Sequence, residues 1–123
     1  MLTRPVQYFP ASQVTSEFGV GSLSEGAHHH VMTARRTEPG EVELHEHEMD
    51  VFYILGGEAT FITGGAMLGK RQTDSGQWRG TDIEGGEVHQ LKQGDVIVIP
   101  AGIPHWFEAV PKQVDYFVVK VIH

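Results

Sequence analysis

Short apolar runs, separated by glycine, proline and aspartate, dominate the chain, and many of them alternate with polar residues. A two-residue period is typical of β-strands with one buried face, and no long stretch has the 3.6-residue period of an amphipathic helix. Val, Ile, Phe and Thr, which favour strands, fill most of these runs. About eight short strands predict an all-β sandwich or barrel. The predicted strands are His28–Arg35, Glu41–His47, Val51–Leu55, Glu58–Thr63, Val88–Leu91, Val96–Ile99, His105–Ala109 and Val114–Ile122.

The segments between these strands predict three further features. Gly56 and Gly57 separate two predicted strands, and they predict a two-residue hairpin because glycine readily adopts positive φ. Residues 64–86 form the least regular stretch, which predicts a long loop at the rim or an ordinary surface excursion. Residues 1–27 are expected to form an N-terminal arm, as an extra strand or one exchanged with a partner, before a barrel at 28–123.

Composition limits the class of protein. The chain has 123 residues, of which 40% are hydrophobic and 20% charged, as in an ordinary single globular domain. No apolar run approaches the ~20 residues of a membrane span. No unbroken apolar segment opens the chain, so we expect no secretory signal and a cytoplasmic location. The net charge of -7 disfavours phosphate backbones and anionic membranes, so we expect neither nucleic acid nor membrane as a partner.

Histidine is the residue type with the most chemical information. The chain has 8 histidines and no cysteine, so any metal must be held by imidazole, carboxylate, amide or water. His45 and His47 stand one residue apart in a predicted strand, whose alternation would direct both imidazoles and Glu43 to one face. Asp50 follows closely. Its carboxylate either reaches back to a metal or serves as a solvated turn residue.

A second candidate lies in residues 94–107, GDVIVIPAGIPHWF. A glycine turn leads into an apolar strand, and the spaced residues Pro100, Gly102 and Pro104 then predict a tight bend. That bend delivers His105 to the start of another strand and fixes the direction of its side chain. Taken alone, His105 is equally well explained as a hydrogen-bonded core histidine.

Together these stretches resemble the two conserved motifs of the cupin superfamily, whose small single-domain members are double-stranded β-helix (jelly-roll) barrels. The resemblance covers roughly residues 28–122. Two spacers of the first motif are one residue short, with Asp in place of the usual Glu, whereas the second has the usual spacing, with Ala109 in place of Asn. The first motif is matched by Gly40, His45, His47, Asp50 and Gly57, and the second by Gly94, Pro100, Gly102 and His105.

The resemblance implies an all-β cupin barrel with a divalent transition metal (Fe, Mn, Ni, Zn or Cu) at its centre. The implied metal ligands are His45, His47, His105 and Asp50. Glu43 is the alternative acidic ligand because it is in phase with the histidines of its predicted strand. The implied function is a metal-dependent enzyme acting on a small organic molecule, of the dioxygenase, isomerase or dehydratase type.

Other functions fit the same residues. The alternative is a non-catalytic cupin that binds or senses a small molecule or sugar, with or without a metal, and a metal that only stabilises a small barrel is a further possibility. For an enzyme, the candidate proton-transfer residues are His28, His30 and Glu43, although an exposed strand end explains the two histidines equally well. The sequence leaves open whether the protein is catalytic.

The expected partners are a small-molecule ligand or substrate and a second copy of the chain. A homodimer is expected from the family and because the edges of an open barrel need covering, with the arm at Gln7–Phe18 as the contributing element. Arg35, Arg36 and Arg79 are candidates to neutralise an anionic substrate at the rim, but a surface role is favoured for such residues.

Overall fold

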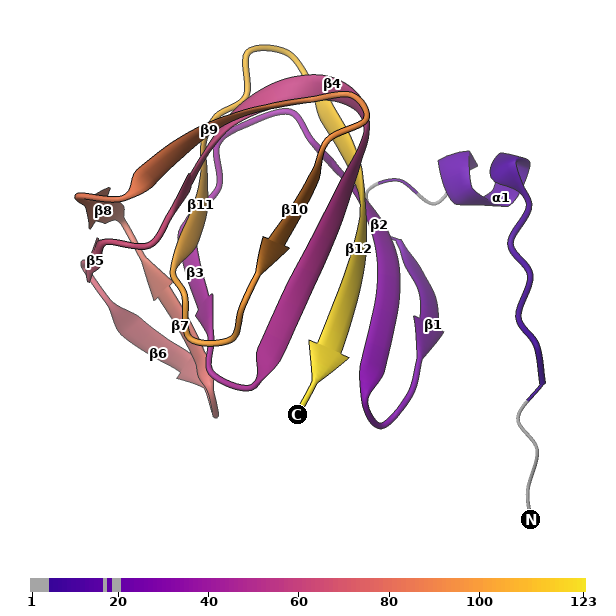
Figure 1. Cartoon of the computed structure of the whole chain (residues 1–123), viewed down its shortest axis with the longest axis horizontal. Helices are drawn as coiled ribbons and strands as arrows, with labels where there is room; N and C mark the ends of the chain where they lie inside the picture. Colours follow the sequence, from indigo (N-terminus) through magenta and orange to yellow (C-terminus); the bar gives the residue numbers. More distant parts are fainter. Residues whose placement is uncertain (1–4, 17, 19–20) are drawn as a thin grey trace.

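The structure of the chain, a computed structural model, describes residues 5–16, 18 and 21–123. The described residues form a short helix, α1 (Ala11–Ser16), and twelve strands, most of which surround a common interior (Figure 1). None of the described helices has the length and apolar character that a membrane span requires. The strands are β1 (Ser22–Glu25), β2 (His29–Arg36), β3 (Val42–His45), β4 (Glu48–Thr63), β5 (Ala66–Leu68), β6 (Arg71–Asp74), β7 (Gln77–Gly80), β8 (Asp82–Glu84), β9 (Glu87–Lys92), β10 (Val96–Ile99), β11 (His105–Ala109) and β12 (Val114–Ile122).

Ten of these strands form one antiparallel sheet in the order β1-β2-β12-β4-β11-β3-β7-β6, with β9 and β10 also paired to β4. The first half of β4 pairs with β12 and β10, and its second half pairs with β11 and β9. Strands β5 and β8 form a separate pair. The predicted all-β class is therefore confirmed, and β4 is the strand that joins the two layers.

The predicted hairpin at Gly56 and Gly57 is wrong, because β4 runs through both residues as one 16-residue strand. Gly57 has φ 74, and a Cβ there would lie 1.9 Å from the carbonyl oxygen of Gln113. The pairing of β4 with β12 shifts register next to this point. The glycines therefore bend a continuous strand and let β12 approach closely, instead of reversing the chain.

An aromatic cluster fills the barrel beneath the polar residues. Its ring centroids lie 4.7 to 5.9 Å apart, within the range of favourable aromatic contacts. Two residues before Phe52 on β4 and two before Phe107 on β11, the next inward positions are occupied by the polar residues Asp50 and His105. The cluster consists of Phe52, Phe61, Phe107 and Tyr116. It therefore forms an apolar floor for a polar centre.

Residues 64–86, predicted as a loop, instead contain β5 to β8, and β7 pairs with β3. Their polar composition hides the strand pattern because both faces of β6 are exposed. The β7 strand is nevertheless half-buried, and its inward residues reach the candidate site described below. Within the predicted loop, β7 is therefore a structural part of the barrel wall.

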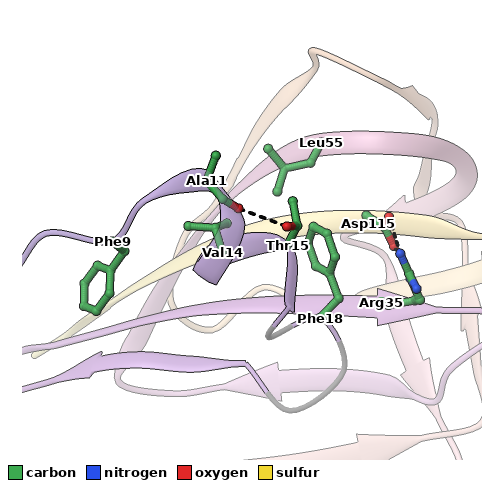
Figure 2. A pocket seen from close by; sticks show the side chains of 8 residues that line it. All are labelled: Phe9, Ala11, Val14, Thr15, Phe18, Arg35, Leu55 and Asp115. Carbon is green, nitrogen blue, oxygen red and sulfur yellow. Dashed lines mark hydrogen bonds and ion pairs between the residues drawn. The ribbon is translucent and has the colours of Figure 1, made fainter.

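The predicted arm has two described parts, whereas residues 1–4, 17 and 19–20 lie outside the described residues. Its last part forms β1, which pairs with β2 and extends the sheet. Helix α1 covers a cavity of about 710 Å³ against the outer side of the barrel (Figure 2). The cavity is lined by Phe9, Ala11, Val14, Thr15, Phe18, Arg35, Leu55 and Asp115.

Candidate metal centre

Three buried side chains from three strands converge at the polar end of the barrel. His45 ends β3, Asp50 lies on β4 and His105 begins β11, and they are 5%, 2% and 4% exposed. The Oδ2 atom of Asp50 lies 3.6 Å from the Nε2 atom of each histidine. One ligand atom from each residue lies within 4.8 Å of the other two, so the group can hold a metal ion.

Local structure explains why these histidines meet. Glu43 pairs with His105 in the antiparallel register, so the inward faces of β3 and β11 coincide. The Pro100–Pro104 bend contains Gly102 at φ 80, and its N–H donates to the carbonyl oxygen of His45 at 2.8 Å. The bend is therefore tied directly to the end of β3, which fixes where β11 begins.

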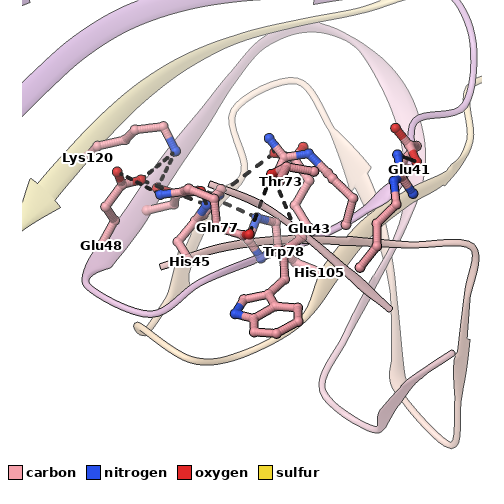
Figure 3. Close-up of polar contacts among 12 residues, drawn as sticks. Glu41, Glu43, His45, Glu48, Thr73, Gln77, Trp78, His105 and Lys120 are labelled. Atoms are coloured by element: carbon pink, nitrogen blue, oxygen red, sulfur yellow. Dashed lines mark hydrogen bonds and ion pairs between the residues drawn. The ribbon is translucent and has the colours of Figure 1, made fainter. Parts of the chain in front are cut away.

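Hydrogen bonds set the tautomer of both imidazoles. His105 Nδ1 lies 3.0 Å from the carbonyl oxygen of Ile103, which can only accept, so Nδ1 carries the proton. His45 Nδ1 likewise lies 2.5 Å from Gln77 Oε1 (Figure 3). The Gln77 amide is oriented by its NH₂ group, which donates to Glu48 Oε1 at 3.3 Å. In its neutral form, each ring then presents the lone pair of Nε2 toward Asp50, as a metal ligand must.

Burial also favours the neutral form of His105. Its pKa is lowered mainly by removal from water, against the opposing effects of the Ile103 carbonyl and the nearby carboxylates of Glu43 and Asp50. A neutral imidazole keeps its lone pair available, because a proton would otherwise occupy the ligand position.

Lys120 balances the charge of buried Asp50 and partly buried Glu48. Its Nζ lies 2.8 Å from Asp50 Oδ1 and 3.5 Å from Glu48 Oε2. An almost fully buried aspartate requires such a partner, because an unpaired buried charge is strongly unfavourable. The lysine engages only Oδ1, so Oδ2 stays directed at the two histidines.

The spacing of the three donors is close to that of ligands around one transition-metal ion. Imidazole nitrogen and carboxylate oxygen bind such ions at about 2.0–2.2 Å, so two ligands of one ion are at most about 4.4 Å apart. The two 3.6 Å separations lie within this limit. Two imidazoles with one carboxylate suit Fe, Mn, Ni, Zn and Cu.

The structure brings together three of the four predicted ligands and leaves His47 apart. Strand β3 ends at His45 and the chain bends at residues 46 and 47, so the predicted common face for His45 and His47 is wrong. His47 is exposed and lies outside the group of converging ligand atoms. Of the two acidic candidates, Asp50 lies within that group, whereas Glu43 Oε1 is 3.8 Å from His45 Nε2 at its edge.

The predicted common face of His28 and His30 is also wrong, because His28 is an exposed bend residue before β2 begins. His30 stands opposite Lys120 in the register, on the inward face of β2. Its Nε2 lies 3.0 Å from Ser22 Oγ and 3.4 Å from Glu25 Oε1.

Sequence reasoning missed Gln77, Glu48 and Lys120. Gln77 lay in the predicted loop, and Glu48 in the interval between two predicted strands, so neither had a predicted direction. Lys120 carried a detectable signal, because it is in phase with the inward residues Tyr116 and Val118 of a mostly apolar strand.

Comparisons with known proteins agree with this architecture. A structure from Bacillus halodurans is 16% identical, covers 84% of this chain and 69% of that chain, and gives a TM-score of 0.61. The cupin domain of Schizosaccharomyces pombe Cnp3 is 12% identical over 84% of this chain and 59% of that chain, with a TM-score of 0.59. The DMSP lyase DddQ from Ruegeria pomeroyi is 18% identical over 78% of this chain and 39% of that chain, with a TM-score of 0.54.

At these identities the structural likeness shows the fold alone. A search of curated proteins found no match to the chain. The family model described as Cupin matches residues 27–122, which is most of the sequence and includes all three converging residues. The chain therefore belongs to the cupin family.

Proposed function

We propose that this cupin binds one divalent transition metal ion through His45, Asp50 and His105, and acts with it on a small organic molecule. The observation that carries the proposal is the convergence of two Nε2 lone pairs and one carboxylate oxygen in a buried site. Both tautomers are already fixed by hydrogen bonds from the opposite ring nitrogens. Such an arrangement is prepared for a metal before the metal arrives.

Three protein ligands are typical of a catalytic rather than a structural ion, because at least one coordination position stays open. When bound, the metal would act there as a Lewis acid or redox centre toward a substrate oxygen. Glu43 is the candidate proton acceptor, since its carboxylate lies at the edge of the centre and is 27% exposed. His30, on the inward face opposite Lys120, is a second candidate.

Fold similarity does not select a reaction, because cupin barrels are a scaffold on which the site decides the chemistry. The similar structures include a lyase and a domain of Cnp3, at identities too low to transfer either role. We therefore propose dioxygenase, isomerase and dehydratase reactions as the classes to test. We also keep the proposals of a cytoplasmic location and a homodimer.

Removal of the metal distinguishes this proposal from a purely structural ion. The open coordination position predicts that EDTA strips the metal within hours, that added metal restores it, and that the melting temperature falls by only a few degrees. Thermal melting and elemental analysis, before and after dialysis against EDTA, measure both quantities. Loss of folding on removal of the metal would instead indicate a structural ion.

A further inference from the structure

A charged cavity of about 490 Å³ opens beside the candidate metal centre. It is lined by Arg36, Pro39, Gly40, Glu41, Glu43 and Arg79. Arg36 belongs to β2 and Arg79 to β7, so two strands far apart in the sequence contribute a guanidinium group to one cavity. Glu43 is shared with the centre itself, because its Oε1 lies 3.8 Å from His45 Nε2.

Arg36 is held in place but has unused hydrogen-bonding capacity. Its guanidinium carbon lies 5.2 Å from the centre of the Phe107 ring. On Gly40, a Cβ atom would lie only 2.7 Å from Arg36 Nη1, so the glycine makes room for the guanidinium. The Nε atom is buried without a hydrogen-bond partner among the described residues. This atom is closed to solvent, whereas the Arg36 side chain as a whole is 30% exposed, so the rest of the side chain is the part that a molecule in the cavity can reach.

Two arginines and two glutamates line the cavity, but one of these glutamates also pairs with Arg71, which lies outside the lining. Arg36 Nη2 lies 3.8 Å and Arg79 Nη2 lies 3.4 Å from the carboxylate of Glu43, so two guanidinium groups share one acid. Neither distance is that of a good hydrogen bond between charged groups. The other acid, Glu41, is already paired with Arg71 at 2.7 Å. The cavity can therefore accept a further anion.

The geometry also sets how far this anion would lie from the centre. Glu43 Oε1 is 3.4 Å from Arg79 Nη2 and 3.8 Å from His45 Nε2. The distance between the arginine and histidine nitrogens therefore cannot exceed the sum of these two distances. A short organic acid spans that separation, with its carboxylate at the arginines and its other polar group directed toward the centre. The planar donor pairs of arginine match a carboxylate well.

From these contacts we propose that the cavity binds the carboxylate of a short organic acid, and that this acid is the substrate or ligand of the neighbouring centre. The inference rests on the proposed function and names its substrate class. Arg36 and Arg79 are the residues that recognise the acid, and Glu43 keeps both guanidinium groups directed into the cavity until the acid arrives.

Isothermal titration calorimetry on the full chain, loaded with its metal, tests this inference. The probes are acetate, oxalate, malonate, succinate and 2-hydroxysuccinate, and dimethyl succinate serves as the uncharged control. We expect at least one acid to bind below about 10 mM and the diester not to bind. Arg36→Gln and Arg79→Gln should each weaken this binding about ten-fold or more, because a hydrogen bond to a charged group is lost.

Arg35→Gln is the matched control. It removes the same charge from the adjacent residue, which is on the outer face of β2 and pairs with Asp115 at 2.8 Å, away from the cavity. We expect this variant to bind the acid as the wild type does. If Arg36→Gln fails to fold, Arg79→Gln carries the test alone, because it is the Arg36 guanidinium that packs on the buried Phe107 ring.

Elemental analysis of the same samples separates this inference from the proposed function. Three results would overturn the inference: equal affinity for the acid in the wild type and both arginine variants, equal binding of the diester, or no binding of any acid. If the metal content were full in such samples, the proposed function would still stand. Arginine-dependent binding of acid by a chain that never takes up metal would support the anion cavity and contradict the proposed metal centre.

Discussion

Asp50 serves two partners with its two carboxylate oxygens, and this division explains how a buried charge is tolerated at the centre. Oδ1 accepts from Lys120 at 2.8 Å, whereas Oδ2 faces His45 and His105 at 3.6 Å. The lysine supplies a compensating charge, so we expect the site to stay folded when no ion is bound. A metal can then add to Oδ2 without displacing the lysine.

Tyr116 gives a prediction for alkaline pH. Burial raises the pKa of its hydroxyl above the ordinary value of 10.0, and the charge of Arg36 only partly opposes this effect. The folded chain therefore holds the phenolic proton more tightly than the unfolded chain. This contribution to stability is complete below pH 10 and is lost as the pH rises through the folded-state pKa.

Melting temperatures measured from pH 8 to about 11.5 test this directly. We expect the wild type to lose more stability above pH 10 than Tyr116→Phe, which lacks the ionisable group. Parallel curves for the two proteins would show that Tyr116 does not contribute to the alkaline transition.

At the level of elements, patterns with strong local signals were predicted well. Strands β10, β11 and β12 have the predicted bounds, because each is an apolar or alternating run limited by glycine, proline or a polar turn. Strand β7 was not predictable, because its four residues carry no apolar alternation and are defined by pairing with distant β3. The anchor of His45, Gln77, was missed for this reason.

The residues of the candidate centre were predictable only where a local signal fixes them. The turn before β11 fixes His105 locally, and the sequence indicates its role. His47 could not be placed correctly, because the end of β3 depends on tertiary contacts: the backbone N–H of Glu46 donates to the carbonyl oxygen of Gly76 at 2.9 Å. One such contact bends the chain and moves His47 out of phase with His45.

The bend in β4 predicts an asymmetric response of its two glycines. Gly57→Ala should lower the free energy of unfolding by at least about 2 kcal/mol, because alanine is strained at φ 74 and its Cβ would collide with Gln113. At Gly56 a Cβ would approach only Asp115 Oδ2, at 4.0 Å, so Gly56→Ala should cost less than about 1 kcal/mol. Urea unfolding measures both. Equal losses in the two variants would contradict the proposed role of Gly57.

At the scale of the whole molecule, two apolar surfaces are left uncovered. Strand β10 pairs only with β4 among the described strands, and its Val96 and Val98 are more than half exposed. In the arm before α1, Val6 and Tyr8 are exposed as well. Exposed apolar side chains at a free sheet edge favour association with another chain.

We therefore expect a homodimer in solution. Light scattering should give twice the 13.6 kDa chain mass at micromolar concentration. Deletion of residues 1–18 should shift the mass toward the monomer if the arm contributes to the interface. A wild-type mass of one chain under the same conditions would exclude the dimer.

Metal content tests the central claim most directly. Plasma mass spectrometry of the untagged protein, after reconstitution with Fe, Mn, Ni, Zn and Cu in turn, should find about one ion per chain. His45→Ala and His105→Ala should each lose it, whereas His47→Ala, the matched exposed control, should retain it. Absence of any metal from the reconstituted wild type, or loss of metal only in His47→Ala, would contradict a centre built on His45, Asp50 and His105.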